Sequence, residues 1–264
     1  MRNKFFIIFF MALGVFSRAP AMQITSADEI TEEWLVNSGA ETGYTEHVRH
    51  FKRLFNNCQV RTFLEFGVGF STKYFIDNCE NVISVEFVTP GTGPEWLQYC
   101  MNLYASCKTW TPIAYFAGLG LDTSWTPYKY LGADSVYKAA AYQPVYRKSY
   151  APIDSSFLDD LNKFVQEQVT ANTIDVAFVD AGVCLRGDLV QVLFNKVPII
   201  AAHDIASKEK RQLDDVYGYG RIIVPQNYVE IFIPFGMGTA FWIKNEASYA
   251  NLIQDLQNYA ATGP

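Results

Sequence analysis

Residues Val60–Phe87 read VRTFLEFGVGFSTKYFIDNCENVISVEF, and this stretch decides the fold. The short apolar run Thr62–Phe66 predicts a strand, and the glycines Gly67 and Gly69 that follow predict a sharp turn. A helical pattern comes next, and a second apolar run, Val82–Val85, predicts another strand. The stretch is therefore a strand, glycine turn, helix and strand, which is the repeating unit of a parallel α/β sheet.

The turn at the end of the first strand suits a ligand that contains a nucleoside. Glycine lets the backbone turn sharply and approach a ligand closely, and Ser71 can cap the helix, whose first N–H groups are free to bind. Glu86 ends the second strand, 19 residues beyond Gly67. A carboxylate at this distance binds the ribose diol in nucleotide-binding units. An ordinary tight turn is the alternative interpretation.

The identity of the nucleotide depends on two further positions. A dinucleotide site requires glycine or alanine where this chain has Thr72, and Glu65 just before the glycines favours a cofactor with an ammonium group. Here the sequence resembles the class I S-adenosylmethionine-dependent methyltransferases, whose first motif is an acidic residue followed by G-x-G. The resemblance implies S-adenosylmethionine as the cofactor, held by Glu65, Phe66, Gly67, Gly69, Ser71 and Glu86.

The N-terminus has the features of a secretory signal peptide. Residues Met1–Ala21 contain a basic start, the apolar core Phe5–Phe16 and a small-residue cleavage site. The apolar run has about 12 residues, whereas a membrane span needs roughly 20, so we expect no stable membrane anchor. The sequence thus predicts export to the periplasm or the medium, with residues 22–264 forming a single domain. If the N-terminus is not cleaved, the protein stays in the cytoplasm.

The net charge and the cysteine content argue against some kinds of partner. The net charge is −6 and the isoelectric point is about 5.1, so the sequence has no basic surface for phosphate groups and we expect no nucleic-acid partner. The five cysteines form no C-x-x-C pair, which gives no support for a structural zinc site. In an exported protein Cys100 and Cys107 could form a local disulfide, but buried free thiols are an equally good interpretation.

Two helices are predicted between Ala27 and Asn56, before the first strand. Thr45 can cap the second of them. His47 and His50 lie one turn apart on it, which is a spacing that can bind a metal ion. No carboxylate or cysteine partner is evident beside them in the sequence, so we interpret both histidines as solvent-facing or packing residues.

The middle of the chain carries an aromatic insertion. A helix over Glu95–Ser106 and a strand over Pro112–Phe116 are followed by Gly118–Pro152, which is rich in tyrosine and shows no clean helix or strand period. A stretch of this length is typical of a lid or binding loop, and its aromatic content argues against disorder. It either covers the substrate or packs over one edge of the sheet.

Two more strands end in polar residues. Ser156-x-x-Asp159 has the pattern of a capping box at the start of a helix that leads into the strand Ile174–Val179. That strand ends at Asp180, and after a helix over residues 185–194 the strand over residues 197–202 ends at His203 and Asp204. If the strands are parallel, these side chains share one rim with the glycine turn. The alternative for Asp204 is a bond to backbone N–H groups of the next turn.

The segments V-D-A-G, R-G-D-L and A-H-D resemble a subgroup of small-molecule and sugar O-methyltransferases. The resemblance implies that Asp180, His203 and Asp204 face a small-molecule or carbohydrate acceptor, and that Asp180 and Asp204 bind Mg²⁺ in several relatives. Where relatives carry a histidine after V-D-G, this chain has the residues Val183 to Arg186. His203 can serve as the general base instead, because an imidazole titrates near neutral pH.

The C-terminal part predicts how the sheet ends. Tyr228–Ile233 and Thr239–Lys244 are joined by a turn that contains Gly236 and Gly238 and predict a β-hairpin, and a helix over residues 247–259 follows. An antiparallel pair added to a parallel sheet is how the class I methyltransferase fold ends. We therefore expect an α/β fold: a Rossmann-like three-layer sandwich with a mostly parallel seven-stranded sheet that ends in an antiparallel hairpin.

Two functions remain open at this stage. The first is transfer of a methyl group from S-adenosylmethionine to an oxygen of the acceptor. The second is an exported, non-catalytic binding protein on a methyltransferase-like scaffold, because S-adenosylmethionine is made in the cytosol and an exported enzyme must obtain it there or from another cell. Cofactor binding discriminates between the two.

Overall fold

The computed structural model describes residues 24–42, 44–88, 93–116, 136–138, 155–181, 185–214 and 217–263. The predicted signal peptide lies outside these ranges, as does the tyrosine-rich insertion except for Val136–Lys138. Among the helices in these ranges, none combines the length and the apolar character needed to cross a membrane.

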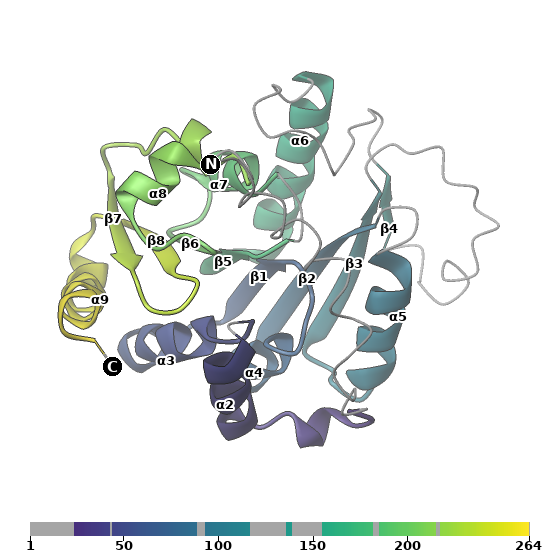
Figure 1. The fold of residues 1–264 in the computed structure, drawn as a ribbon. Helices are drawn as coiled ribbons and strands as arrows, with labels where there is room; N and C mark the ends of the chain where they lie inside the picture. The colour runs from purple at the N-terminus through teal and green to yellow at the C-terminus, as the bar shows by residue number, and fades with distance from the viewer. Residues whose placement is uncertain are drawn as a thin grey trace, which may run out of the picture.

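The described strands form one mixed sheet in the order β4-β3-β2-β1-β5-β6-β8-β7 (Figure 1). Their bounds are β1 Thr62–Phe66, β2 Asn81–Val88, β3 Trp110–Phe116, β4 Val136–Lys138, β5 Val176–Val179, β6 Ile199–His203, β7 Tyr228–Ile233 and β8 Thr239–Lys244. The mostly parallel sheet with a terminal antiparallel hairpin is confirmed. Within the described residues the sheet contains the seven predicted strands and one more, the short β4, which adds to the edge beside β3.

The pairing places β1 at the centre. Phe63 lies opposite Val82 of β2 on one side and opposite Val176 of β5 on the other, and both pairings are parallel. Beyond β6 the direction changes: β8 runs antiparallel, with Ala240 opposite Ala202, and β7 pairs with β8 as a hairpin. The chain order therefore reverses between β1 and β5, and ligands of open α/β sheets bind at such a reversal, beyond the carboxyl ends of the strands.

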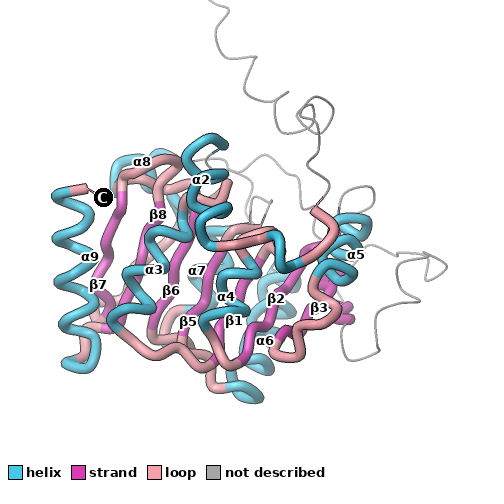
Figure 2. The backbone as a smooth tube through the Cα atoms, turned by 90° about the horizontal axis from the view of Figure 1, so that it is seen from below, coloured by secondary structure: helices cyan, strands magenta, loops and turns pink. Residues whose placement is uncertain are grey.

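Helices cover both faces of the sheet, so the predicted three-layer sandwich is confirmed. Figures 1 and 2 show α3, α4, α5 and α9 on one face and α6 and α7 on the other. The helices are α2 Glu32–Thr42, α3 His47–Asn57, α4 Thr72–Asn78, α5 Gly93–Leu103, α6 Ser155–Asn172, α7 Arg186–Leu193, α8 Lys208–Leu213 and α9 Ala250–Thr262, with 3₁₀ turns η3 Ala27–Glu29, η6 Tyr219–Arg221 and η7 Ala247–Tyr249.

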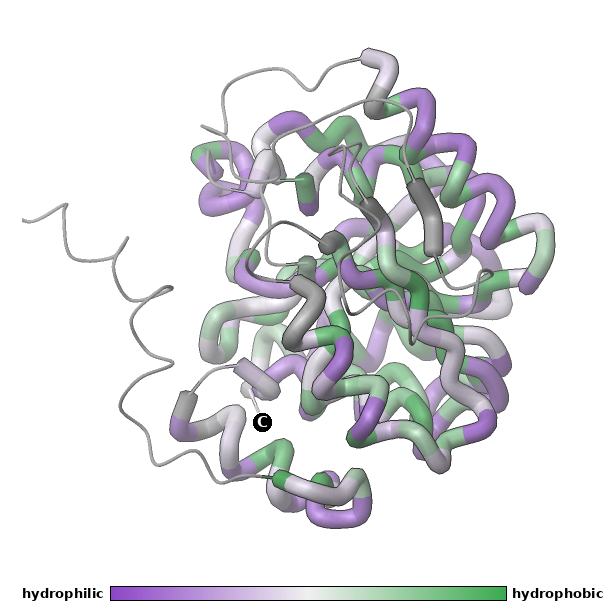
Figure 3. The backbone as a smooth tube through the Cα atoms, turned by 90° about the vertical axis from the view of Figure 1, so that its right-hand side faces the viewer, coloured by the Kyte–Doolittle hydropathy of each residue, from purple (hydrophilic) through white to green (hydrophobic). Residues whose placement is uncertain are grey.

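Alternating strand residues build the two cores. In β1, Phe63 faces the α3 layer and packs on Phe51 of α3 and on Phe75 of α4, with ring centroids 5.5 Å and 4.1 Å apart. Its neighbour Leu64 faces the other layer, where Phe164 of α6 is also buried. Figure 3 shows hydrophilic and hydrophobic stretches alternating along the outer helices, as expected when one face of each helix is buried. Burial on both faces explains why the strands are almost continuously apolar.

Three predicted helix caps are wrong. Thr45 does not cap α3, because its hydroxyl donates to the carbonyl oxygen of Leu35 in α2 at 2.6 Å. Ser71 precedes α4 but makes no side-chain capping bond, and Ser156 lies inside α6, which already begins at Ser155. In each case the hydrophobic pattern located the helix, whereas the partner of the hydroxyl depends on tertiary structure.

The cysteines within the described ranges are free thiols, and the local disulfide between Cys100 and Cys107 is not formed. Cys100 has no exposed surface and packs in the core with Leu97. Burial raises the pKa of the Cys79 thiol to about 12, so this side chain behaves as a small apolar residue. The interpretation of the cysteines as buried packing residues fits Cys79 and Cys100.

Candidate functional site

The carboxyl ends of β1, β2, β5 and β6 meet at one rim of the sheet. The Asp180 N–H, just after β5, donates to the carbonyl oxygen of Phe66 at the end of β1 (2.9 Å). The Gly67 N–H donates to the carbonyl oxygen of Val85 in β2 (2.8 Å). The glycine turn is therefore tied to both neighbouring strands, at the position where the chain order reverses.

Only glycine fits at position 67. Its φ of +101° lies in the region that other residues avoid, and a Cβ there would lie 2.7 Å from the carbonyl oxygen of Asp180. Gly69 differs, because a Cβ built on it meets no atom of the described residues within 4 Å. The first glycine thus lets two backbones approach each other, and the second leaves open space above the turn.

A buried acid lies beneath the glycine turn. Glu65 has no exposed surface, and its Oε1 accepts hydrogen bonds from Thr72 Oγ1 (2.6 Å) and Ser84 Oγ (2.5 Å). Thr72 Oγ1 in turn accepts from the Gly69 N–H at 3.0 Å, which links the glycine turn to the buried acid. Burial raises the pKa of Glu65 to about 8. Its Oε2 is buried and unpaired among the described residues.

Glu86 is the second acid of the predicted cofactor site. Its Oε2 accepts a hydrogen bond from the Val68 N–H at 3.0 Å, so it lies directly beside the glycine turn. Burial raises its pKa to about 7. The side chain of Phe66 takes no part in this arrangement, because it is buried in the α6 layer near Phe87, with ring centroids 6.2 Å apart. Phe66 reaches the rim only through its backbone.

Arg186, at the start of α7, joins the predicted acceptor residues. Its Nη1 lies 3.1 Å from Asp180 Oδ1 and 2.7 Å from Asp204 Oδ2, and its Nε donates to the carbonyl oxygen of Ala181. The ring of Tyr217 stacks on the guanidinium at 4.1 Å. With only 5% of its side chain exposed, Arg186 is a fixed positive charge between two carboxylates.

The structure brings Asp180, His203 and Asp204 together, as the sequence predicts. His203 Nδ1 lies 3.4 Å from Asp180 Oδ1 and 3.6 Å from Asp204 Oδ1. Burial alone would lower the pKa of His203, but the two negative charges outweigh it and the pKa is raised. For Asp180, burial is likewise outweighed, here by the positive charges of His203 and Arg186, which hold the pKa well below its usual range. The Asp204 carboxylate faces Arg186, while the next N–H, of Ile205, pairs with Gly238.

His47 belongs to this cluster and was not predicted as a site residue. It has no exposed surface, and its ring centroid lies 4.7 Å from that of His203. Both ring nitrogens lack a hydrogen-bond partner among the described residues, at a cost of about 1–3 kcal/mol for each buried polar group. Burial also lowers its pKa well below the usual value. The spacing of His47 from Phe51 and Leu54 on the apolar face of α3 was the signal that it points inward.

His50, by contrast, is a packing residue. It is buried, its Nδ1 lies 2.9 Å from Thr239 Oγ1, and its ring contacts Tyr259 of α9 with centroids 5.9 Å apart. The interpretation of His50 as a packing residue fits these contacts. The two histidines of α3 therefore serve different purposes although they are only one turn apart.

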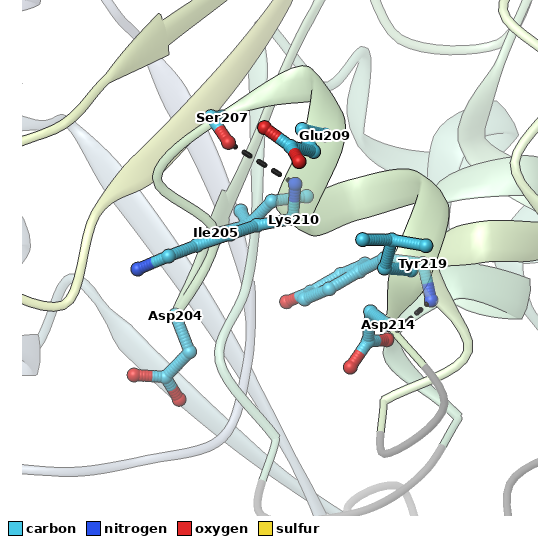
Figure 4. A pocket seen from close by; sticks show the side chains of 8 residues that line it. Asp204, Ile205, Ser207, Glu209, Lys210, Asp214 and Tyr219 are labelled. Atoms are coloured by element: carbon cyan, nitrogen blue, oxygen red, sulfur yellow. Dashed lines mark hydrogen bonds between the residues drawn. The ribbon is translucent and has the colours of Figure 1, made fainter.

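A cavity of about 590 Å³ opens beside Asp204 (Figure 4). Its lining consists of Asp204, Ile205, Ser207, Glu209, Lys210, Leu213, Asp214 and Tyr219. Ser207 caps α8 through the Lys210 N–H, and Asp214 accepts from the Tyr219 N–H. The Tyr219 hydroxyl donates to the carbonyl oxygen of His203 at 2.6 Å, which ties the cavity wall to the cluster. The short α8 and η6 that form this wall were not predicted.

The residues present do not fit a Mg²⁺ ion that bridges Asp180 and Asp204. Mg²⁺ requires near-octahedral oxygen coordination. One nitrogen of Arg186 already contacts both carboxylates. The guanidinium therefore supplies the positive charge that such an ion would bring to these two side chains.

The residues around the glycine turn do fit S-adenosylmethionine. The space above Gly69 leaves room for close approach of a ligand, Glu86 lies beside it, and the buried Oε2 of Glu65 has no partner among the residues described. Carboxylates suit both the ribose hydroxyls and the ammonium of this cofactor. These residues offer groups that can bind this cofactor, and all of them lie at or just after the ends of β1 and β2.

Comparisons with known proteins gave similarities of structure alone. No family model and no curated protein matches the chain. Similar solved structures include a candidate caffeoyl-CoA O-methyltransferase from Staphylococcus aureus (14% identity, 89% of this chain and 97% of that chain, TM-score 0.46). Others are a Podospora anserina methyltransferase bound to S-adenosylhomocysteine (12%, 83% and 88%, 0.40) and one from Geobacter sulfurreducens (10%, 90% and 97%, 0.43). No function is inferred from similarities this distant.

The observed strand order can be compared with the fold that the sequence resemblance implies. The sheet is parallel from β4 to β6, the glycine turn follows the central strand β1, and the antiparallel β8 lies between β6 and β7. The described part of the chain therefore has the Rossmann-like fold of the class I S-adenosylmethionine-dependent methyltransferases.

Proposed function

We propose that this protein is an S-adenosylmethionine-dependent methyltransferase that acts on an oxygen of a small-molecule or carbohydrate acceptor. One observation carries the proposal: the glycine turn with Glu86 lies on the same rim as the cluster of Asp180, His203 and Asp204. The backbone contact between Gly67 and Asp180 joins the two halves. A cofactor half and an acid–base half in direct contact are what a group transfer requires.

In this proposal the cofactor lies over the turn at Gly67 and Gly69, and Glu86 binds its ribose. When bound, S-adenosylmethionine supplies an electrophilic methyl group on a sulfonium that leaves as a neutral thioether. Glu65 acts from below, because it is fully buried and holds the turn through Thr72. Its role is to keep the turn in place, because Thr72 Oγ1 joins it to the Gly69 N–H.

The acceptor half supplies the base. His203 would accept the proton of the acceptor hydroxyl, which would leave the oxygen free to take the methyl group that the cofactor would supply. Asp180 and Asp204 stabilise the imidazolium that results, since both lie within 3.6 Å of its Nδ1. Arg186 holds the two carboxylates in place through contacts of its Nη1 with both. The cavity beside Asp204 is large enough for a small acceptor such as a monosaccharide unit.

Calorimetric titration with S-adenosylmethionine and S-adenosylhomocysteine tests the cofactor half. We expect micromolar binding of both, and loss of at least about tenfold in affinity, or 1.4 kcal/mol, in Glu86→Gln. Glu80→Gln, which changes an exposed glutamate between α4 and β2, is the matched control and should bind normally. Absence of binding by the folded protein would overturn the proposal and favour an exported scaffold without catalysis.

The proposal includes export, with cleavage after Ala21. Mass spectrometry of the protein isolated from its producing cell should then find Met22 at the N-terminus. An intact Met1–Ala21 segment would instead support a methyltransferase that works in the cytoplasm, where its cofactor is made.

A further inference from the structure

His47, Asp180 and His203 each direct a possible metal ligand to one place. The three ligand atoms lie within 4.8 Å of one another, and the residues come from α3, from the end of β5 and from the end of β6. We propose that these three side chains form a binding site for a transition-metal ion such as Zn²⁺ or Co²⁺. This site differs from a Mg²⁺ site on Asp180 and Asp204 in its ligands and in its preferred ion.

The spacing of the ligands supports the proposal. Ligands around a tetrahedral ion with bonds of about 2.1 Å lie about 3.4 Å apart. His203 Nδ1 and Asp180 Oδ1 are 3.4 Å apart, so this pair already has the required separation. The His47 ring lies edge-on to the His203 ring, with centroids 4.7 Å apart and an interplanar angle of 70°. All three ligand atoms lie within 4.8 Å of one another, so the His47 side chain must move closer to complete a tetrahedral site.

The unpaired nitrogens of His47 are a second, independent observation. His47 is fully buried, and neither of its ring nitrogens has a hydrogen-bond partner among the described residues. Buried polar groups nearly always have a partner, and an unpaired one requires an explanation such as an ion that binds there. A metal ion shared with His203 and Asp180 would give one of these nitrogens a bond.

The ligand set selects the type of ion. Two imidazoles and one carboxylate suit Zn²⁺, Co²⁺ or Fe²⁺, whereas Mg²⁺ prefers oxygen ligands alone. Asp204 is not a ligand of this site and keeps its ion pair with Arg186 at 2.7 Å, so only one of the two carboxylates that Arg186 contacts would bind the ion. Three protein ligands leave a further position open to water or to an oxygen of a ligand.

Asp180 provides the access to solvent. Its side chain is 22% exposed, whereas the side chain of His203 is 5% exposed and His47 is fully buried. An ion can therefore enter from the rim of the sheet, bind first to the carboxylate and then exchange water for the imidazoles behind it.

The inference does not rest on methyl transfer, and it has a consequence for the proposed mechanism. The ion would occupy His203 Nδ1, the nitrogen that faces Asp180 and Asp204 in the proposed mechanism, so the ion-bound protein could not form the imidazolium that these carboxylates stabilise. Metal binding is therefore measured without cofactor or acceptor. A negative result there leaves the proposed methyl transfer untouched, and a protein that does not bind S-adenosylmethionine can still bind the ion.

The test is calorimetric titration of the purified protein with Zn²⁺, repeated with Mg²⁺. We expect one Zn²⁺ per chain with micromolar or tighter affinity, and no competition by millimolar Mg²⁺. His47→Phe should weaken Zn²⁺ binding by roughly 100-fold or more while it keeps the ring contacts with Phe51 and Phe178. His50→Gln is the matched control on the same helix and should change the affinity by less than about threefold, because His50 is not a ligand.

Unchanged Zn²⁺ affinity in His47→Phe would overturn the proposal, since it would mean that the ion binds elsewhere, for example to the free thiols of Cys58 or Cys107. X-ray absorption at the zinc edge of the unaltered protein gives a second readout that needs no variant. Two imidazoles with oxygen in the first coordination shell are expected, and a sulfur ligand would refute the assignment.

Discussion

The backbones of Gly67 and Asp180 touch, so that a single added carbon on Gly67 would lie 2.7 Å from the Asp180 carbonyl oxygen. This contact sets the distance between the proposed cofactor half and the proposed acid–base half of the site. It also makes position 67 one of the most restricted in the chain, because the backbone there has a φ of +101°.

We predict that Gly67→Ala lowers the free energy of unfolding by about 1–3 kcal/mol, because it combines a strained φ with a backbone clash. Gly69→Ala is the matched control for stability, since its Cβ meets no atom of the described residues within 4 Å, and it should change stability by less than about 0.5 kcal/mol. Urea unfolding of both variants measures the difference. Equal stability of the two would show that the close contact with Asp180 is not maintained in solution.

Replacement of Arg186 by methionine should destabilise the protein by about 3 kcal/mol, because the partly buried carboxylates of Asp180 and Asp204 would lose the buried cation between them. Arg186→Lys should lie between this variant and the unaltered protein, since lysine keeps the charge but loses the bond to the Ala181 carbonyl. Lys52→Met, which breaks a surface ion pair with Glu32, should cost about 1 kcal/mol or less. Chemical denaturation measures the free energy of unfolding of each of the three variants.

The pH dependence of stability should report the buried Glu65. Its pKa is raised to about 8 by burial, so between about pH 5 and pH 8 the folded protein holds a proton that the unfolded chain has lost. Stability from this group therefore falls as the pH rises, by at most about 1.4 kcal/mol per pH unit. Glu65→Gln has no such proton, so its stability relative to the unaltered protein should increase over this range. A difference that does not change with pH would contradict the burial of a titrating Glu65.

Once an acceptor is known, the pH profile of kcat/KM should report His203. The base must be unprotonated, and because its pKa is raised by Asp180 and Asp204, the rate should increase as the pH passes through a value above the usual one for histidine. Asp204→Asn removes one of the two charges and should move this increase to lower pH. His203→Asn should reduce kcat by about 10²–10⁴-fold. A profile that is the same in Asp204→Asn would exclude His203 as the base.

Much of this fold could be predicted from hydrophobic patterns. The bounds of β7 and β8 are those expected from the apolar runs Tyr228–Ile233 and Thr239–Lys244, which flank a turn that contains glycines. Helix starts were less predictable. The hydroxyls of Thr45 and Thr72 bond to groups distant in sequence or on a neighbouring strand, and local propensity carries no information about such partners.

In the candidate site, too, some residues could be predicted from the sequence and others depend on tertiary packing. The rim with Asp180, His203 and Asp204 follows from the rule that parallel strands end on one side of a sheet, so sequence reasoning located it. Arg186 and His47 were missed as members of the cluster because their positions depend on how α7 and α3 lie against the sheet. A helical histidine whose neighbours one and two turns on are Phe51 and Leu54 was the available signal, and it indicates only that the side chain faces inward.

The place of β8 between β6 and β7 has a consequence for synthesis of the chain. β6 carries His203 at its end and has β5 on one side, and its other neighbour, β8, begins only at Thr239. Until the ribosome has released that segment, Ile199–His203 is an open sheet edge of apolar residues, ready to pair with another nascent chain. Assembly of the site is therefore among the last events of folding, and truncations before Thr239 should aggregate even though they retain the whole glycine turn and every residue of the acid–base cluster.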